Sequence, residues 1–530
     1  MSPYDYIVVG AGSAGCVVAS RLAHAGFTVL LLEAGGSDNK FWVKVPIGYG
    51  RMFFDERVNW KYNTEPGKNL DNRVSYWPRG RVIGGSSSIN AMVYYRGLPH
   101  DYDDWARAGN PLWTWEQVEP AFDEIENFMD AAGIQHGRGP LLITDCGQQH
   151  HKIRNHFFAA GETLGLPHNP AMIGGPGIGD YCITARNGRR CSAADAFLKP
   201  ALKTGRISVL KNAMVDRIEL ENQRAVGVTF RLRGTQHKVY ARREIVISAG
   251  AVNTPKLLML SGIGEGEQLR EHGIEAIHEL PAVGRFMQDH LAVTYFYKAT
   301  APTLNNALHS WWGKTLAGAR YLATRKGPLA LSVNQCGGFV TAREGGRPDM
   351  QLYFNPITYT KIPEGERPLL NPDSYPGFQI CFQPGRPWSR GEIRLSASHP
   401  DAPPVIRPGY LSDERDLEDV VAGGQLIQRL VATPALDGLI KSPVGPDPRL
   451  MNDAEFIHDY RQRADTVFHP CGTCRMGSTP DNAVVDGTLS VHGLDRLRVI
   501  DASVFPNITS GNTNAPTIMT AWRGAGFMLD

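Results

Sequence analysis

The segment HPCGTCRMG, from His469 to Gly477, places a histidine beside Cys471 and Cys474 in a C-x-x-C spacing. Metal ligation, thiol exchange and proton abstraction by the histidine all use such residues. A zinc site of this type comes with a second ligand pair, which the sequence lacks, and a thioredoxin-like pair follows the first strand of a small α/β unit. We therefore expect no metal and no redox thiols here, which makes His469 a candidate base.

The first 33 residues have the pattern of a dinucleotide site. Residues 5–10 and 28–32 are apolar runs typical of strands, and residues 13–25 between them have helical character. The glycines of the G-x-G-x-x-G that joins strand to helix allow a tight turn, a close pyrophosphate and close packing. A carboxylate ends the second strand, where it can bind an adenosine ribose and would repel a 2′-phosphate. These residues do not separate FAD from NAD. They are Gly10, Gly12, Gly15 and Glu33.

A second polar loop, residues 77–90, is rich in glycine and serine, WPRGRVIGGSSSIN. Backbone and hydroxyl groups dominate it, which suits close contact with a flat, polar, charged ligand. Ile83, Ile89, Met92 and Val93 indicate that the loop is partly buried, so its backbone groups need partners.

Length and composition set the broad class. At 530 residues the chain is long enough for two domains, and 42% apolar residues, 20% charged residues and a formal charge of +2 are typical of globular proteins. We expect no nucleic-acid partner. The eight scattered cysteines lack the spacing of a disulfide framework, and no secretion signal or membrane-spanning run is visible, so a cytoplasmic protein is expected.

Four long motifs resemble those of the glucose-methanol-choline (GMC) oxidoreductases. They are residues 80–103, residues 250–264 (GAVNTPKLLMLSGIG), the segment HPCGTCRMG, and residues 510–517 (SGNTNAPT). They follow the family's order over nearly the whole chain, which also resembles the bacterial choline-dehydrogenase-like alcohol dehydrogenases.

The resemblance implies FAD in an extended pose. It implies an α/β chain, α+β overall, with a Rossmann-type FAD-binding domain and a discontinuous substrate domain on an antiparallel sheet. The FAD-binding domain would comprise residues 1–150, 195–290 and 462–530, and the substrate domain residues 151–194 and 291–461. The residues expected to contact FAD are Gly10, Gly12, Ser13, Ala14, Gly15, Glu33, Ala34, Trp77, Arg81, Gly84, Gly85, Ser87, Asn90, Ala91, Met92, Val93, Val215, Ala249, Gly250, Asp501, Ala502, Asn512 and Thr513.

The sequence departs from the family pattern at three places. Some members attach FAD covalently through a histidine near Asn90, and since an asparagine cannot do so we expect a non-covalent flavin. Phe286 stands where the family usually has asparagine. Glycines in residues 518–527 predict a frayed or shortened last helix, because each costs about 1 kcal/mol inside a helix.

The resemblance also gives His469 and Asn512 catalytic roles. An alkoxide expels hydride more readily than an alcohol does, so removal of the hydroxyl proton is required, and neutral histidine suits that task near pH 7. In the family pattern His469 is this base. Asn512 would orient the substrate oxygen, and Cys471 and Cys474 would pack as small apolar side chains.

The substrate region is less defined. Residues 350–354 and 391–396 alternate as strands do. Residues 300–338 carry aromatic and apolar residues among lysines and arginines; we favour a helix buried against the sheet, with a lid or a helix at the membrane surface as the alternative. Aromatic residues there and at Tyr353, Phe354 and Phe468, the expected pocket, favour an apolar or aromatic primary alcohol.

The predicted activity is oxidation of a primary alcohol to an aldehyde by proton abstraction and hydride transfer to flavin. A dehydrogenase that uses a quinone or dye is favoured over an oxidase that uses O2 and forms hydrogen peroxide. A hydroxynitrile-lyase-like enzyme with an idle flavin is the alternative from another class. Contact with the inner membrane from the cytoplasmic side is an additional expectation, and the sequence does not predict the oligomeric state.

Overall fold

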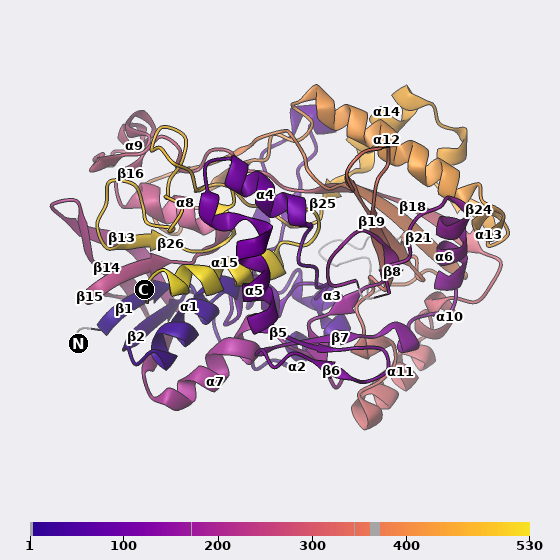
Figure 1. Cartoon of the computed structure of the whole chain (residues 1–530), viewed down its shortest axis with the longest axis horizontal. Coiled ribbons are helices and arrows are strands. Elements are labelled where there is room, and N and C mark those ends of the chain that lie inside the picture. The colour runs from indigo at the N-terminus through magenta and orange to yellow at the C-terminus, as the bar shows by residue number, and fades with distance from the viewer. Residues whose placement is uncertain (1–3, 171, 344, 361–370, 530) are drawn as a thin grey trace.

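The computed structural model describes residues 4–170, 172–343, 345–360 and 371–529. Two large sheets occupy opposite halves of the molecule (Figure 1). The chain crosses between the halves several times, so each half contains segments far apart in sequence. The α/β fold class expected from the sequence is confirmed.

The first sheet has the order β12-β2-β1-β15-β14-β13, with β26 beside β15. The pairs among β12, β2, β1, β15 and β26 are parallel, and β13 and β14 extend β15 as an antiparallel meander. The apolar runs of β1 and β2 are buried because the helices α1 and α15 pack together over this half (Figure 1). The bounds are β1 Tyr4–Val9, α1 Ser13–His24, β2 Val29–Glu33, β12 Ile207–Lys211, β13 Ala213–Glu221, β14 Arg224–Leu232, β15 Thr235–Ile247, α8 Gly250–Leu260, β26 Leu497–Val499 and α15 Asn514–Gly526.

The second sheet is antiparallel, with the order β24-β18-β21-β20-β19-β8. Helices α6 and α12 pack on one of its faces. Since side chains alternate along a strand, every second residue points to the opposite face, toward the first half of the molecule. The bounds are α6 Arg154–Thr163, β8 Gly177–Asp180, β18 Leu291–Ala299, β19 Cys336–Val340, β20 Met350–Asn355, β21 Gly377–Pro384, α12 Glu414–Val431 and β24 Ile440–Val444.

One short strand does not follow the expected domain division. β25 (Asp465–Thr466) lies in residues 462–530, which we assigned to the FAD-binding domain, yet it pairs with β18 of the second sheet. His469 follows directly, so the chain returns to the first half only after the expected base.

The remaining elements connect and cover the two sheets. The helices are α2 Phe41–Lys44, α3 Tyr49–Met52, α4 Pro99–Arg107, α5 Trp115–Ile125, α7 Lys199–Ala201, α9 Gly266–Glu271, α10 Leu304–Leu308, α11 Trp311–Thr324, α13 Pro434–Asp437 and α14 Asp453–Arg463. The strands are β3 Tyr62–Asn63, β4 Tyr76–Trp77, β5 Glu126–Met129, β6 Gln135–His136, β7 Leu141–Asp145, β9 Cys182–Ile183, β10 Ala185–Arg186, β11 Arg189–Arg190, β16 Ile263–Gly264, β17 His278–Glu279, β22 Glu392–Arg394 and β23 Val405–Arg407.

Two helices differ from the sequence-based expectation. α15 is a continuous helix to Gly526, not a shortened one. A side chain at Gly524 would collide with Leu489 and Ile500, so the absence of one allows this helix to lie close to the core. The expected burial of the helix in residues 300–338 is wrong: α11 lies at the lower right edge of the molecule with most of its surface exposed (Figure 1).

All eight cysteines are buried and unpaired. Burial raises the pKa of the Cys471 and Cys474 thiols, and both belong to the main hydrophobic core, which agrees with a packing role.

Among the described residues, no group of histidine, cysteine and carboxylate side chains is arranged to hold a metal ion. In the same part of the chain, no helix combines the length and apolarity needed to cross a bilayer.

Candidate active site

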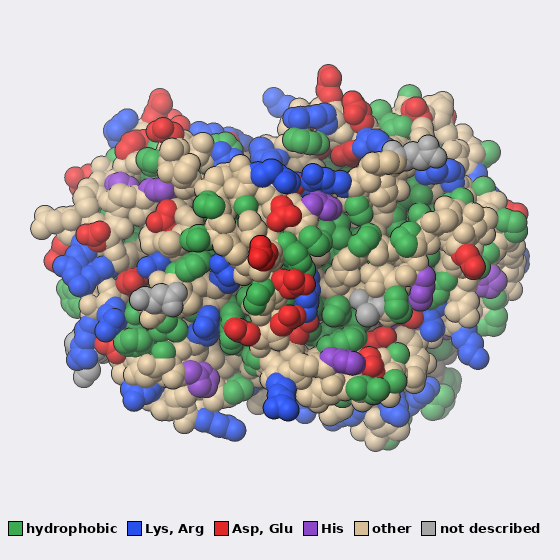
Figure 2. Space-filling view, in the orientation of Figure 1, with side chains coloured by type: hydrophobic (Ala, Val, Ile, Leu, Met, Phe, Trp, Pro, Cys, Tyr) green, Lys and Arg blue, Asp and Glu red, His purple; other side chains and the backbone are tan. Residues whose placement is uncertain are grey.

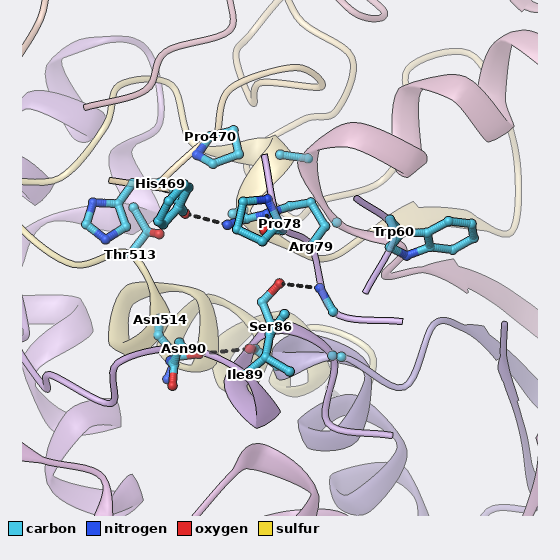
Figure 3. A pocket seen from close by; sticks show the side chains of 18 of the residues that line it. Trp60, Pro78, Arg79, Ser86, Ile89, Asn90, His469, Pro470, Thr513 and Asn514 are labelled. Atoms are coloured by element: carbon cyan, nitrogen blue, oxygen red, sulfur yellow. Dashed lines mark hydrogen bonds between the residues drawn. The ribbon is translucent and has the colours of Figure 1, made fainter. Parts of the chain in front are cut away.

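A cavity of about 590 Å³ runs between the two sheets and is lined by residues of both halves (Figure 3). Its size is in the range of cofactor and small-molecule sites. One end lies at β2 and β13, the middle lies along the two glycine-rich segments, and the other end lies beneath the second sheet.

The glycines of residues 10–15 allow contacts that no side chain would permit. Gly10 has φ +99°, and a Cβ there would lie 2.4 Å from the Ser248 carbonyl oxygen. A Cβ at Gly15 would lie 1.9 Å from the Gly10 oxygen, so α1 packs directly on the end of β1. Gly12 faces the cavity between them.

The second glycine segment lies against the first. The Gly84 N–H donates to the Ala11 carbonyl (2.7 Å), and a Cβ added to Gly85 would lie 2.6 Å from the Gly12 Cα. The Ser87 hydroxyl donates to the Gly84 carbonyl (2.6 Å), which fixes the turn. The two segments together form a cradle with few side chains, consistent with close approach of a pyrophosphate.

Glu33 lies at one end of the cavity. Its carboxylate accepts from the backbone N–H groups of Ala11 (2.9 Å) and Gly35 (2.8 Å). Burial raises the pKa of this carboxyl to about 7, and the two N–H groups oppose that shift. A buried carboxyl with unused acceptor capacity at this position suits a ribose diol.

Most of the residues expected to contact FAD line this cavity, and a few do not. The lining residues are Gly10, Gly12, Ser13, Ala14, Glu33, Ala34, Gly85, Asn90, Ala91, Met92, Val93, Val215, Ala249, Gly250, Asp501, Ala502, Asn512 and Thr513. Gly15, Gly84 and Ser87 lie behind the surface and hold the cradle. Trp77 is buried in β4, and the Arg81 guanidinium lies over the Trp60 ring, 4.8 Å from its centroid.

His469 and Asn512 meet at the far end of the cavity. The Asn512 amide nitrogen lies 3.2 Å from His469 Nε2, and its oxygen accepts from the Gln351 amide (3.4 Å). His469 is buried, and this burial, with smaller contributions from His290 and Arg79, holds its pKa well below the ordinary histidine value. The imidazole is therefore neutral near pH 7.

His290 fixes which nitrogen of His469 carries the proton. His290 Nε2 lies 2.8 Å from the Gly385 carbonyl oxygen, and its Nδ1 lies 3.0 Å from His469 Nδ1. Burial lowers the pKa of His290 to about 4, so it too is neutral. A carbonyl only accepts, so His290 Nε2 donates and its Nδ1 accepts from His469 Nδ1–H. The lone pair of His469 is left on Nε2, facing Asn512 and the cavity.

The chain around His469 is fixed by Asp289 and Arg79. Asp289 accepts from the His469 backbone N–H (2.7 Å) and from the hydroxyls of Tyr410 and Thr466. The Arg79 guanidinium donates to the Phe468 carbonyl (2.7 Å; Figure 3). Phe468 has φ +73°, a conformation uncommon for a bulky residue. These contacts hold the strained backbone that aims the histidine.

The wall of the cavity opposite the cradle is one face of the second sheet. Alternation along β18, β20 and β21 places Thr294, Phe296, Tyr353, Gln379 and Cys381 on this face. Phe354 points to the other face, where it stacks on Phe157, so it does not line the expected pocket.

Three amides interrupt this wall. Asn355 and Gln379 are cross-strand neighbours, and the side-chain amides of Asn355 and Asn334 lie 3.1 Å apart. The Gln379 amide nitrogen donates to the Tyr359 hydroxyl (3.0 Å). Aromatic rings of Phe53, Tyr353 and Phe468 lie around the same space.

Sequence reasoning missed three residues that support the site, of which His290 and Arg190 are buried and Arg79 is half-buried. Arg79 was inside the quoted loop of residues 77–90 but had no role, and His290 had none either. Arg190, whose pKa burial lowers to about 9, donates to the Asn90 side chain (2.7 Å) and the Ser87 carbonyl (3.2 Å). The adjacent Asp289 and His290 were a sequence signal from which the role of His290 could have been predicted. No local sequence pattern marks Arg190 as a residue of the site. Phe286, the departure noted above, has φ +62° and lies beneath the Arg475 guanidinium.

Comparison with known proteins places this arrangement in a family. The GMC oxidoreductase models match residues 4–292 and 387–521. An alcohol dehydrogenase (acceptor) from Pseudomonas putida is 38% identical, covering 99% of this chain and 96% of its own. An oxygen-dependent choline dehydrogenase from Vibrio vulnificus is 37% identical over 99% and 94%. The crystal structure of pyridoxine 4-oxidase from Mesorbium loti superimposes with a TM-score of 0.87 at 30% identity, covering 99% and 98%.

The fold and the site define an FAD-dependent oxidoreductase that acts on CH–OH donors. The chain belongs to the GMC oxidoreductase family, and the resemblance seen in its motifs is confirmed. The residues present fit FAD: a buried carboxyl at one end, the glycine cradle in the middle and a neutral histidine at the other end. A Cβ at Gly250 (φ +85°) would meet no atom within 4 Å, so space for a ligand continues at the start of α8.

Proposed function

We propose that this protein oxidises an uncharged primary alcohol with an aromatic or apolar body to the aldehyde, as a dehydrogenase. The observation that carries the proposal is the hydrogen-bond chain from the Gly385 carbonyl through His290 to His469, which leaves the His469 Nε2 lone pair facing the cavity. Alcohol oxidation of this general kind is the activity of the family relatives named above.

The residues divide the work between holding the substrate and moving its proton. His469 Nε2 accepts the hydroxyl proton, and the Asn512 amide donates to the substrate oxygen as charge develops there. FAD, when bound, supplies the hydride acceptor. Both histidines are neutral before the reaction, so His469 Nε2 can accept the substrate proton across the physiological pH range.

The cavity wall favours an uncharged substrate. Aromatic rings cover much of it, and the charged residues near it are engaged: Arg463 pairs with Asp459, Arg79 donates to backbone oxygens, and the Asp465 carboxylate accepts from the Thr466 backbone N–H. The amides of Asn334, Asn355 and Gln379 have donor and acceptor groups beyond those that pair with each other, with Tyr359 or, for Asn355, with the Phe354 and Val333 carbonyls, and buried amides are costly unless paired. A substrate with a second neutral polar group could form hydrogen bonds with these amides. Asn355 lies two residues after Tyr353 in β20, which places it about 7 Å further along the strand.

We further propose that the flavin is bound without a covalent link. Among the described residues that line the cavity, His469 is the one histidine, and Asn90 occupies the position where a linking histidine was considered. A quinone or dye is the acceptor we favour, because the Pseudomonas putida relative bears the name of an acceptor-dependent alcohol dehydrogenase.

Anaerobic mixing tests this proposal directly. Purified holoenzyme is mixed with 4-methylbenzyl alcohol, 1,4-benzenedimethanol, hexanol or choline, and the flavin absorbance is followed before air is admitted. We expect bleaching by the two benzylic alcohols, faster for the one with the second hydroxyl, and slow recovery in air. Rapid recovery would identify an oxidase. If no alcohol bleaches a chemically reducible flavin, the proposal fails and a lyase becomes the better hypothesis.

The substitution Gln379→Leu tests the amide wall in the same assay. We expect the preference for 1,4-benzenedimethanol over 4-methylbenzyl alcohol to fall by about tenfold, the effect of one lost neutral hydrogen bond with its buried partner left unpaired. Gln425→Leu, at a residue of α12 whose amide bonds Asp453 outside the cavity, is the control. An unchanged preference in Gln379→Leu would show that the amides do not contact substrate.

A further inference from the structure

Helix α11 presents large apolar side chains to solvent. Trp311, Trp312, Leu316 and Leu322 are exposed by 68%, 74%, 72% and 60%. Among the described residues, no other helix shows four such side chains in the exposed state. Large exposed apolar patches on a globular protein usually mark a contact surface.

These side chains share one face of the helix. At 100° per residue, Trp311, Leu322, Trp312 and Leu316 fall within an arc of about 140°, with the exposed Thr315, Ala319 and Ala323 between them. The buried residues Ala317 and Tyr321 lie on the opposite side. We call the outward arc, with these seven residues, the α11 face.

The α11 face is bordered by positive charge. Residues 301–342 contain no aspartate or glutamate, whereas Lys314, Arg320, Arg325 and Lys326 are all exposed. Basic and hydrophobic side chains lie together at the lower right edge of the space-filling view, where α11 is located (Figure 2). Tryptophan and leucine flanked by lysine and arginine are typical of helices that lie in a membrane interface.

The inner side of α11 packs close to the candidate substrate cavity. Ala317 belongs to a small apolar cluster with Tyr49, Phe53 and Ile357, against which Phe468 and Tyr359 also pack. Phe53, Phe468 and Tyr359 line the cavity. The helix therefore covers the aromatic end of the cavity with its inner side, while the side chains of its outer side are exposed.

We propose that the α11 face docks the protein onto an anionic lipid surface. A second copy of this chain fits poorly, because joining two α11 faces would bring eight like charges together. A bilayer with anionic lipid supplies both an apolar layer for the tryptophans and leucines and negative charge that attracts the lysines and arginines of the border. This docking is independent of the reaction proposed above.

Sedimentation with lipid vesicles tests the docking. Holoenzyme is mixed with vesicles of phosphatidylcholine alone or phosphatidylcholine with phosphatidylglycerol, and the bound fraction is measured at low and high salt. We expect binding to the anionic vesicles, weakened by salt, with a blue shift of tryptophan fluorescence. The double variant Trp312→Ser, Leu316→Ser should bind at least about tenfold more weakly, since it removes two large apolar side chains that would be buried in the lipid.

Two matched variants separate the contributions. Lys314→Glu with Arg320→Glu should lose the preference for anionic vesicles, and Trp388→Ser, at an exposed tryptophan outside α11, should bind as the unmodified protein does. Flavin content and far-UV circular dichroism verify folding of each variant. The proposal is overturned if the α11 variants bind vesicles unchanged, if no vesicle binding occurs, or if light scattering shows that α11 instead joins two copies of the chain.

Discussion

The two ends of the cavity are built by different means. At the cofactor end, glycine backbone forms the surface: Gly12 and Gly85 face each other, and their neighbours hold them through N–H and carbonyl groups. At the substrate end, side chains on one face of an antiparallel sheet form the wall, and a histidine pair forms the reactive corner. Any side-chain atom added at the cofactor end would therefore obstruct the binding surface. At the substrate end, by contrast, the chemical type of each side chain determines what the wall can bind.

This difference teaches where variation is tolerated. A cradle made of backbone accepts one shape of ligand, and a single methyl group is enough to close it. A wall made of alternating side chains can exchange hydroxyl, amide or ring without moving the strands that hold it. Substitutions at the two ends should therefore fail differently, the first by losing flavin and the second by losing rate or specificity with flavin still bound.

The largest expected effect is that of His469→Ala. Removal of the base should slow flavin reduction by alcohol by about 10²–10⁴-fold, because His469 is the one histidine among the described residues that line the cavity. The flavin should stay bound, as judged by the absorbance of the purified protein. His399→Ala, at an exposed histidine, is the control. Full activity of the His469 variant would remove its assignment as base.

A smaller but distinct effect is expected from Gly15→Ala. The new Cβ would lie 1.9 Å from the Gly10 oxygen, and relief of such an overlap costs about 1–3 kcal/mol. Flavin occupancy should fall by about tenfold, measured by absorbance after gel filtration.

Gly318→Ala is the matched control for this change. Gly318 lies within α11 with open space around its Cβ position, so alanine there should leave flavin content unchanged. Normal flavin content in Gly15→Ala would contradict the tight packing of α1 on β1.

A pair of substitutions at His290, with an expected effect no larger than that of Gly15→Ala, is the sharpest test of the reactive corner. His290→Leu removes the acceptor for His469 Nδ1–H, so the proton can move to Nε2; flavin reduction should slow about tenfold, the size typical when the second partner of a functional histidine is lost. His290→Asn keeps an acceptor oxygen at that position and should recover most of the rate. Equal loss in both variants would mean that His290 has only a packing role.

The pH profile completes this test. In the unmodified protein the pKa of His469 is held below the ordinary value of about 6.5, so the base stays neutral as the pH falls through that value. The rate of flavin reduction should hold its plateau to pH values below about 6.5 and decline only at lower pH. A decline centred at or above the ordinary histidine pKa would contradict the burial described here.

Local motifs predicted the glycine turn at the proposed cofactor end of the cavity, because backbone geometry at such a turn depends on neighbours in the sequence. The turn glycines Gly10 and Gly12 and the strand-ending Glu33 could be recognised from the first 33 residues. The substrate wall could not, since Asn355 and Gln379 become neighbours only through strand pairing, and Phe354 was assigned to the pocket although the alternation of β20 turns it away. Arg190 reaches Asn90 from a hundred residues along the chain, a contact that no local pattern indicates. The exposure of α11 likewise depends on what packs around it.

Because all eight cysteines are buried, the reactivity of each thiol can report local unfolding of the part of the fold that contains it. A thiol reacts as its thiolate, and burial raises the pKa of Cys16, Cys146, Cys191 and Cys381 among others, so the folded protein should be nearly inert to a thiol reagent and to peroxide. The rate at which each cysteine is alkylated then measures how often its part of the fold opens to solvent. Alkylation of Cys16 in α1 and of Cys381 in β21 would measure the opening rates of the two halves separately, without any added probe.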